Sequence, residues 1–293
     1  MSISMNSQSA LHEVESRCTQ ERPPRCQSLC PLGLDARAFL GHAAEGRWSD
    51  ARKQLERYLP LPGLLARICD HPCEQGCLRG DLGGAVNLHG LEIFCTEHLG
   101  VQTRSLPMPR KQKRIAVIGA GLAGLVCAWD LAGKGYPVTV FHEGEPQAQL
   151  LSCWPVLAGA GAAALDAEWE ALGRRGVRFE QARTDTACLQ QAAGEYDGVL
   201  LDAGALPELA PAESGMDAQI LHWRDNICCA GWASVTPTGH RFASASRQAG
   251  QGRSAARTLE RLVAGVSLTA ARDTDERSLF TELDGIAPVE RVL

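Results

Sequence analysis

The chain has little charge bias, few aromatic side chains and no long hydrophobic run. Its 293 residues carry a formal net charge of -5, with an isoelectric point near 5.9, which gives no electrostatic footprint for nucleic acid. No apolar run approaches the roughly 20 residues needed to cross a bilayer, and residues 1–20 lack an apolar signal segment. We therefore expect a soluble, cytoplasmic protein that has no transmembrane segment and does not bind nucleic acid.

Cysteine, in contrast, is abundant and unevenly placed. Seven of the 12 cysteines fall in the first 95 residues: Cys18, Cys26, Cys30, Cys69, Cys73, Cys77 and Cys95. Thiols stay reduced in the cytoplasm, so metal ligation or burial explains them better than disulfides do. The skew favours ligation in the amino-terminal third. The other five are read most simply as buried small hydrophobes: Cys127, Cys153, Cys188, Cys228 and Cys229.

Three of these cysteines, Cys69, Cys73 and Cys77, are spaced four residues apart. On an unbroken helix they would share one face, but Pro72 removes a backbone donor and Gly76 is a weak helix former. We therefore predict a loop wrapped around one or two inorganic centres. A structural zinc site is the alternative, although zinc sites usually have paired C-x2-4-C knuckles.

Short helices are expected around this loop. The prolines of residues 18–31 favour an extended path. Apolar periodicity predicts two helices within 35–59, the first capped by Asp35 and the second by Ser49 or Asp50, and Pro60 and Pro62 are expected to end the second helix. A further helix is expected over 86–99. A small helical module with loops of cysteines is typical of iron–sulfur domains, because its core alone is too small to hold it.

The pattern changes at residue 114. R-I-A-V-I-G predicts a buried strand that leads into G-A-G-L-A-G at 119–124, a helix and a second strand that closes on Glu143. Glycines let the backbone approach a diphosphate at a helix N-terminus, and an acid about 20 residues on takes a ribose hydroxyl. The context therefore predicts a dinucleotide-binding fold. Its candidate residues are Gly119, Ala120, Gly121, Leu122, Ala123, Gly124 and Glu143.

A second glycine run, at 159–164, follows Pro155 too closely for a central strand to precede it, so we predict a helix over 162–174 there instead. Beyond it the pattern predicts strands at 177–179, 196–203 and 226–231, a closing helix over 244–264 and a tail at 266–293.

These motifs resemble a known family. The cysteine module followed by G-x-G-x-x-G looks like the small subunit of glutamate synthase, and it is similar to the N-terminal part of dihydropyrimidine dehydrogenase and to the large subunit of the ferredoxin:NADP transhydrogenases. The resemblance covers roughly residues 18–265 and is strongest in C-P-L-G-L-D at 30–35, in 68–94 and in 114–143. It implies two [4Fe-4S] clusters beside an FAD.

The resemblance also implies the organisation of the chain. The fold class is α/β, with a small α-helical domain that holds two [4Fe-4S] sites and then a Rossmann-like FAD-binding domain. The expected segments are a flexible arm at 1–17, the iron–sulfur domain at 18–100, a linker at 101–113, the FAD-binding domain at 114–265 and the tail at 266–293.

The ligand sets follow from the resemblance as well. One cluster would be held by Cys30, Cys69, Cys73 and Glu92. The other would be held by Cys18, Glu21, Cys26 and Cys77, with Glu21 standing where the family has a cysteine. Three outcomes stay open for this second set: Glu21 ligates iron, the site holds a labile or three-iron centre, or it is empty. Cys95, one helical turn from Glu92, is either a substitute ligand or a buried structural thiol.

The sequence departs from the family in two further places. Only about 22 residues separate Gly204 from Ile227, where the family inserts an NADPH domain with its own glycine fingerprint. Direct use of NAD(P)H by the family's route is therefore disfavoured. Gly231-Trp232 stands where the family has Gly-Asp near the ribityl chain of FAD, and an indole cannot accept the hydrogen bond of that carboxylate.

We therefore expect an electron-transfer subunit that passes electrons between partner subunits through FAD and two [4Fe-4S] clusters. The partners would be ferredoxin-like, flavin or catalytic oxidoreductase subunits, because no catalytic constellation is visible in this chain. It would then be an oxidoreductase only as part of a multisubunit complex. The alternative is a cluster-bearing assembly scaffold whose flavin fold has lost FAD.

Overall fold

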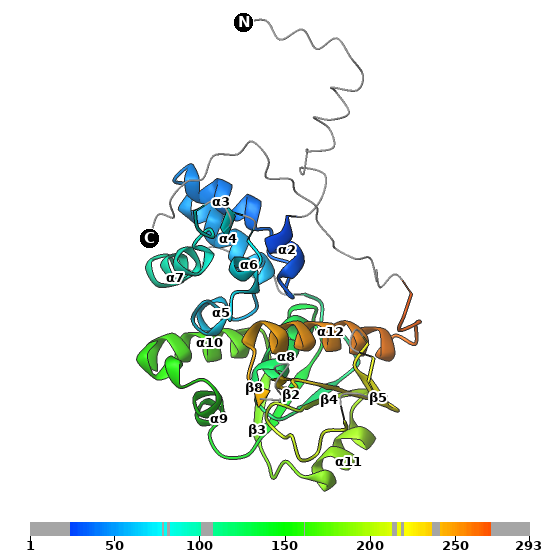
Figure 1. Cartoon of the computed structure of the whole chain (residues 1–293). Helices are drawn as coiled ribbons and strands as arrows, with labels where there is room; N and C mark the ends of the chain where they lie inside the picture. Colours follow the sequence, from blue (N-terminus) through cyan, green and yellow to red (C-terminus); the bar gives the residue numbers. More distant parts are fainter. Residues whose placement is uncertain are drawn as a thin grey trace, which may run out of the picture.

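The structure, a computed structural model, describes residues 24–77, 79–80, 83–100, 108–160, 162–212, 216–217, 220–235 and 241–270. A group of helices lies on one side of an α/β domain (Figure 1). The arm expected at 1–17 lies outside the described residues, as do Cys18, Glu21 and the tail from 271 onward.

The amino-terminal part is helical, as its pattern predicts. Its helices are α2 (Arg25–Leu29), α3 (Ala36–Ala44), α4 (Trp48–Tyr58), α5 (Pro62–Ile68), α6 (Pro72–Gln75) and α7 (Leu88–His98). The Asp35 side chain accepts from the Ala38 amide at 3.0 Å, which confirms the predicted cap of α3. The predicted helices within 35–59 and 86–99 are therefore confirmed. The predicted cap of the second helix within 35–59 is wrong, because α4 begins at Trp48 with Arg47 as its N-cap, so Ser49 and Asp50 lie inside its first turn.

One expectation about proline is wrong. Residues 25–29 form α2 rather than an extended path, because Pro24 is the N-cap, a position where a helix needs no amide hydrogen. The expectation that Pro60 and Pro62 end the second helix is confirmed, since α4 stops at Tyr58. Pro62 also starts α5, a helix that the sequence analysis did not predict, because the fixed φ of proline suits the first turn.

The α/β domain has a six-stranded sheet in the order β3-β2-β1-β4-β6-β5. Its strands are β1 (Ile115–Ile118), β2 (Val138–His142), β3 (Arg178–Gln181), β4 (Gly198–Asp202), β5 (His222–Arg224) and β6 (Ile227–Ala230). All neighbours pair in parallel except β5, which runs antiparallel to β6 at one edge. The β1–α8–β2 unit, with α8 at Leu122–Gly133, is the dinucleotide-type unit that the sequence predicts.

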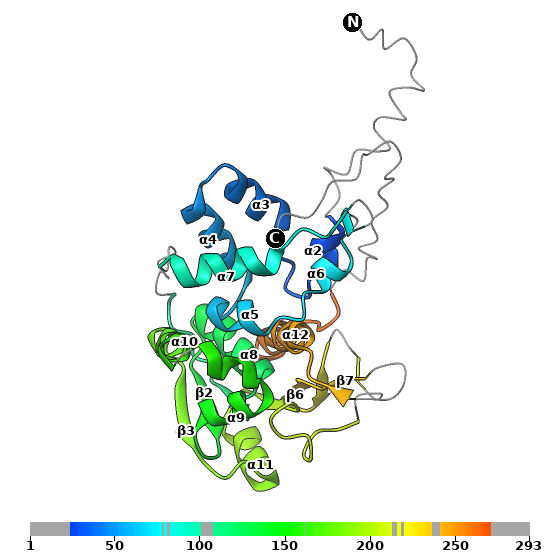
Figure 2. The ribbon, with the colours of Figure 1, turned by 60° about the vertical axis from the view of Figure 1, so that its left-hand side comes forward.

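Helices cover both faces of this sheet. On one face α8 packs along α12 (Ala245–Val263), and α11 (Thr186–Glu195) contacts β4 and β1 from the other face. A short hairpin, β7 (Ser234–Val235) with β8 (Arg241–Phe242), precedes α12. Figure 2 shows α8 and α12 between the sheet and the amino-terminal helices.

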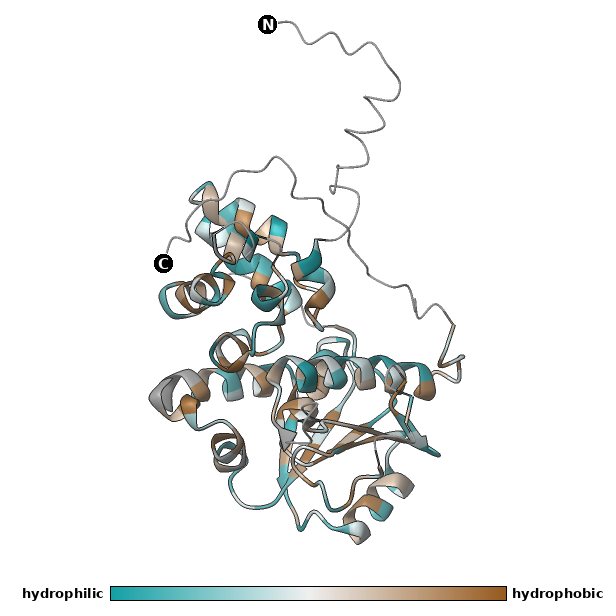
Figure 3. Cartoon of the chain, in the orientation of Figure 1, coloured by the Kyte–Doolittle hydropathy of each residue, from teal (hydrophilic) through white to brown (hydrophobic). Residues whose placement is uncertain are grey.

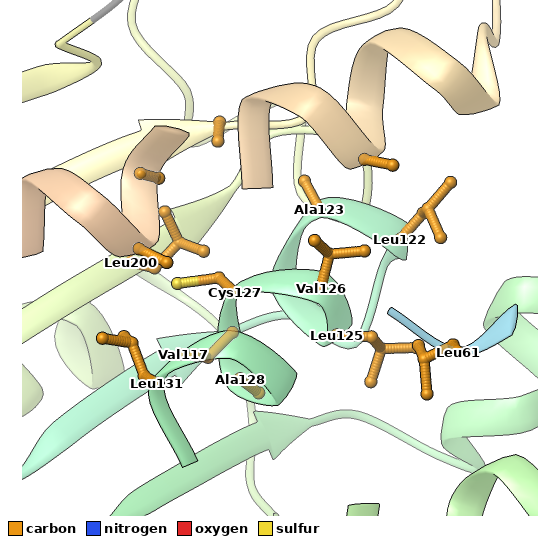
Figure 4. Packing of buried hydrophobic residues seen from close by; sticks show 14 of the residues in the cluster. Leu61, Val117, Leu122, Ala123, Leu125, Val126, Cys127, Ala128, Leu131 and Leu200 are labelled. Atoms are coloured by element: carbon orange, nitrogen blue, oxygen red, sulfur yellow. The ribbon is translucent and has the colours of Figure 1, made fainter. Parts of the chain in front are cut away.

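The core runs through the sheet and continues into the amino-terminal helices. Hydrophobic residues follow the buried strands in Figure 3, because parallel strands covered on both faces are apolar along their whole length. In Figure 4, Ala123 and Cys127 of α8 face α12, while Leu61, which precedes α5, reaches Leu125. Leu61, Leu125 and Cys127 are all fully buried. One continuous apolar core therefore joins the two parts of the chain.

The sequence analysis predicted that the glycine run at 159–164 is not a dinucleotide loop, and the structure confirms this. The run joins a 3-10 segment at Pro155–Ala160 to α10 (Ala162–Arg174), and α9 (Pro146–Cys153) precedes both. The sequence analysis did not identify α2, α5, α6, α9, α11, the edge strand β5 or the hairpin of β7 and β8. Between β4 and β6, the described residues contain β5 and turns but no second glycine-rich strand–helix unit. None of the described helices is long and apolar enough to span a membrane.

Hydrogen bonds also join the two parts. Arg253 of α12 donates to the carbonyls of Leu32 and Tyr58, at 3.1 and 2.7 Å, and it forms an ion pair with Asp130 of α8 at 2.9 Å. Because one guanidinium satisfies three acceptors from both parts, it fixes the amino-terminal helices over α8 and α12.

Candidate functional site

Four residues from separate elements line one small cavity. Cys30 follows α2, Cys69 ends α5, Cys73 lies on α6 and Glu92 lies on α7. The rest of the wall is largely apolar, with Leu34, Leu65 and Leu88 among its residues. The breaks at Cys69 and at the short helix α6 turn these side chains inward, as the predicted loop requires. The structure therefore brings together one of the two ligand sets expected from the sequence.

Glu92 is the most unusual member of this group. Its side chain is only 4 % exposed, and among the described residues no cation or hydrogen-bond donor pairs with its carboxylate. Burial, and then the neighbouring Glu74, raise the pKa of Glu92 to about 8. A buried carboxylate without a partner costs free energy. A positively charged iron site in the cavity would supply the missing partner, so the donor set fits a cluster.

The thiols of the cavity are also shielded from water. Burial raises the pKa of Cys69 and raises that of Cys73 to about 12, and in both cases Glu92 adds to the effect. Burial also raises the pKa of Cys30. Three such thiols are poor free thiolates, but bound iron stabilises the thiolate form.

Cys26 and Cys77 lie at the margin of this site. Cys26 lines the cavity. Burial raises the pKa of its thiol, and the nearby Cys77 adds to this effect. The packing of α2 against α6 brings these two thiols together. Cys18 and Glu21, the other members of the predicted set, lie outside the described residues.

Among the described residues, no three His, Cys, Asp or Glu side chains are placed to hold a single metal ion. The ligands of a four-iron cluster stand farther apart, because each binds a different iron. Cys95 is fully buried but does not line the cavity, as a structural thiol would be.

The remaining cysteines only partly follow the expectation of burial. Cys127, Cys228 and Cys229 are buried, Cys188 is half-buried and Cys153 is exposed. The expectation is therefore wrong for Cys153, which ends α9 at the surface.

A histidine pair that the sequence analysis did not single out stands beside the cavity. His71, between Cys69 and Cys73, has its Nε2 2.6 Å from Nδ1 of His89. Burial and then His89 lower the pKa of His71 to about 4. His71 has φ of 49° and precedes Pro72 of α6. The pair therefore helps to hold the backbone of the cysteine loop.

The cavity also touches the α/β domain. Ser246 of α12 is part of its wall. Asp70, next to Cys69, accepts from the Ser246 amide at 2.8 Å and from the Ser244 hydroxyl at 2.9 Å. It thereby caps the N-terminus of α12 from the other domain. The cysteine loop and α12 are thus held in direct contact.

The glycine-rich loop has the geometry of its motif. Gly119 has φ of 99° at the turn after β1, and a Cβ there would lie 2.9 Å from that of Ala205. Gly121 is the N-cap of α8. Glu143 is exposed just after β2, where a ribose hydroxyl could reach it. These residues have the shape expected of a dinucleotide site.

A carboxylate that the sequence analysis missed fills the space beside this loop. Asp202, at the end of β4, has no exposed surface. Its Oδ2 accepts from the Gly124 amide at 2.7 Å, and its Oδ1 accepts from Gly204 and Ala205 at 2.9 and 3.3 Å. Burial raises the pKa of Asp202 to about 6, although these amide hydrogen bonds act in the opposite direction.

The loop after β6 is closed as well. Gly231 has φ of 100°, and a Cβ there would lie 2.5 Å from Oδ1 of Asp202. The Gly231 amide donates to Gln251 of α12 at 2.7 Å. Trp232 is 8 % exposed, and its indole nitrogen donates to the Pro211 carbonyl at 3.2 Å. The indole is thus a packed structural residue. The glycines have the geometry of a dinucleotide site. The Asp202 carboxylate beside them, however, fills the space that an FAD diphosphate would need.

Comparison with known proteins agrees with this division of the chain. Residues 1–103 match the family model described as dihydropyrimidine dehydrogenase domain II, 4Fe-4S cluster. Residues 114–194 match the model described as glucose inhibited division protein A. The expected [4Fe-4S] domain is therefore confirmed, and the second match supports an FAD-binding type of domain.

Three relatives are named as subunits or chains of oxidoreductases or synthases. NADPH-Fe(3+) oxidoreductase subunit beta of Geobacter sulfurreducens is 34% identical over 120 residues, 40% of this chain and 18% of the relative. NADP(+)-dependent formate dehydrogenase subunit beta of Moorella thermoacetica is 32% identical over 142 residues, 40% of this chain and 20% of the relative. The glutamate synthase [NADPH] small chain of Mycobacterium tuberculosis is 30% identical over 137 residues, 46% of this chain and 28% of the relative.

The chain thus spans between 18% and 28% of the length of these relatives. The resemblance that the sequence indicates is confirmed: an iron–sulfur domain like that of dihydropyrimidine dehydrogenase precedes a Rossmann-like domain of FAD-binding type.

Proposed function

We propose that this chain is an electron-transfer subunit of a larger redox complex. Its amino-terminal domain would hold two [4Fe-4S] clusters, one on Cys30, Cys69, Cys73 and Glu92, and the other on Cys18, Glu21, Cys26 and Cys77. The observation that carries the proposal is the cavity in which the half-buried thiols of Cys30 and Cys69 and the buried thiol of Cys73 meet the buried Glu92.

The position of this cavity supports electron transfer rather than a purely structural role. Ser246 of α12 is part of its wall, and Asp70 joins the cysteine loop to α12. A bound cluster supplies one-electron redox chemistry. The chain's own residues would fix its distance from the α/β domain, shield it from water and set its potential through Glu92 and nearby hydrogen bonds.

The electrons would come from partner subunits. The short connection between β4 and β6 leaves no room for an inserted nicotinamide domain. The relatives named as beta or small subunits support this role. Ferredoxin-like, flavin or catalytic oxidoreductase subunits are the partners that fit such a relay.

The flavin separates two versions of the proposal. FAD in the second domain is supported by the matched domain type, Gly119, Gly121 and Glu143. A cluster-bearing assembly scaffold without FAD is favoured by Asp202 and Trp232. Both versions share the clusters, and both make the chain part of a complex.

Redox titration of the isolated full chain, purified without oxygen, tests the proposal. Dithionite should reduce it and give the electron paramagnetic resonance signals of reduced [4Fe-4S] clusters, while NADPH should leave its visible spectrum unchanged. Rapid reduction by NADPH would contradict the reliance on a partner. A chain that dithionite does not change would contradict electron transfer itself.

A further inference from the structure

The N-terminus of α8 already holds an anion that belongs to the chain. A glycine-rich loop of this type binds the diphosphate of a dinucleotide through backbone amides, and the helix dipole favours the negative charge. Here Oδ2 of Asp202 lies 2.7 Å from the Gly124 nitrogen. The carboxylate therefore makes the kind of contact that a phosphate oxygen would make.

The same carboxylate lies at the meeting point of three glycine loops. Ideal Cβ positions at Gly121 and Gly124 would be 2.6 and 2.8 Å from Oδ2, and one at Gly231 would be 2.5 Å from Oδ1. Glycine at these positions makes room for a close neighbour, and the neighbour that uses this room is Asp202. In the sequence motif, the lack of side chains at these glycines leaves space for a diphosphate. In this chain a carboxylate fills that space.

The Asp202 carboxylate is held in this position by its surroundings. Asp202 is the last residue of β4, paired in parallel with both β1 and β6, so its backbone is fixed. Gly204 and Ala205 hold Oδ1, and the side chain is fully buried. A diphosphate placed beside it would meet a like charge in a region of low dielectric constant.

We propose that the Asp202 carboxylate takes the place of a dinucleotide diphosphate in this domain, so that the wild-type chain binds FAD only weakly. The Rossmann-like domain is then completed by one of its own side chains. It supports the iron–sulfur domain through α8 and α12 without a flavin. This inference rests on the proposed function only through the domain type, and it concerns no cluster ligand.

The direct test is FAD affinity of the full iron-loaded chain with and without the carboxylate. Asp202→Ala frees both the charge and the volume, so the dissociation constant for FAD should fall by roughly 100-fold, the effect of about two to three kcal/mol of restored charged hydrogen bonding. Asp202→Asn keeps the volume and removes the charge, so it should improve the affinity by a smaller factor. Fluorescence quenching of FAD during titration measures both.

Asp185→Ala is the matched control. Asp185 caps α11 in the same domain by accepting from the Cys188 amide at 3.0 Å, but it is not part of the glycine loops. It should leave FAD affinity unchanged. If Asp202→Ala does not fold, the isosteric Asp202→Asn still reports the effect of charge.

Two results would overturn the inference. Wild-type chain that retains one FAD per chain after purification would show that Asp202 does not occupy the diphosphate site. An Asp202→Asn variant that folds and binds FAD with the affinity of the wild type would show that the Asp202 charge does not oppose FAD binding. Iron content is measured on every variant, so a failure of cluster assembly is distinguished from a failure of this inference.

Discussion

Glu92 shows at the scale of one residue why the cavity points to iron. A free buried carboxylate would be expected to find a donor or a cation, yet it faces three thiols instead. Its spacing after the cysteine loop could be recognised in the sequence through the family resemblance. Its burial could not, because that depends on how α7 packs beside α4 and α5.

Removal of Glu92 should therefore make one iron of the cluster labile. Glu92→Ala should lower iron content from about eight to about seven per chain or fewer, since the iron without its protein ligand is easily lost and leaves a three-iron centre with its own electron paramagnetic resonance signal. Glu97→Ala is the control, because Glu97 lies on the same helix but pairs with Arg67 near the surface. Iron analysis of the two variants decides the point, and equal iron in both would remove Glu92 from the ligand set.

Asp202 illustrates what sequence reasoning missed. The signal was present, since one carboxylate ends the apolar run G-V-L-L-D at 198–202. An acid at the end of a strand is common in turns, however, so the pattern alone did not distinguish it. Only the pairing of β4 with β1 places it beside the glycine loop.

At the scale of elements, the features that could be predicted are those with a local cause. The β1–α8–β2 unit was predictable because strand, glycines and helix follow each other in sequence. The closing helix α12 was predictable too, since Ser244 caps it locally by accepting from the Arg247 amide at 3.2 Å. Asp70 adds a further cap from 174 residues away, which no local pattern could reveal.

Asp70→Ala should destabilise the junction between the cysteine loop and α12. Two hydrogen bonds to the helix N-terminus are lost, so the free energy of unfolding should fall by about 1–2 kcal/mol. Asp70→Asn keeps an oxygen acceptor and should lose less. Urea denaturation followed by circular dichroism measures both, and an unchanged midpoint for the alanine variant would show that the cap is not stabilising.

At the scale of the whole molecule, the two parts behave as one unit because a buried core and Arg253 join them. The separate parts were predictable from the change of pattern at residue 114. Their contact was not, since α5 was missed and Arg253 reaches Leu32 and Tyr58 only in the folded chain.

Arg253→Ala should lower the free energy of unfolding by about 2–3 kcal/mol, because three acceptors lose a charged donor. Lys134→Ala is the comparison, since Lys134 pairs with Glu260 at a more exposed site and such pairs contribute about 1 kcal/mol or less. Urea denaturation of both variants gives the difference. An Arg253 effect no larger than that of Lys134 would mean that Arg253 does not stabilise the junction between the two parts.

Iron and acid-labile sulfide per chain, measured on full-length protein purified without oxygen, test the central claim most directly. The account predicts about eight of each, and about four if only the set with Glu92 is filled. A chain that assembles with less than one iron, or with zinc in its place, would contradict the proposal that these cysteines hold clusters for electron transfer.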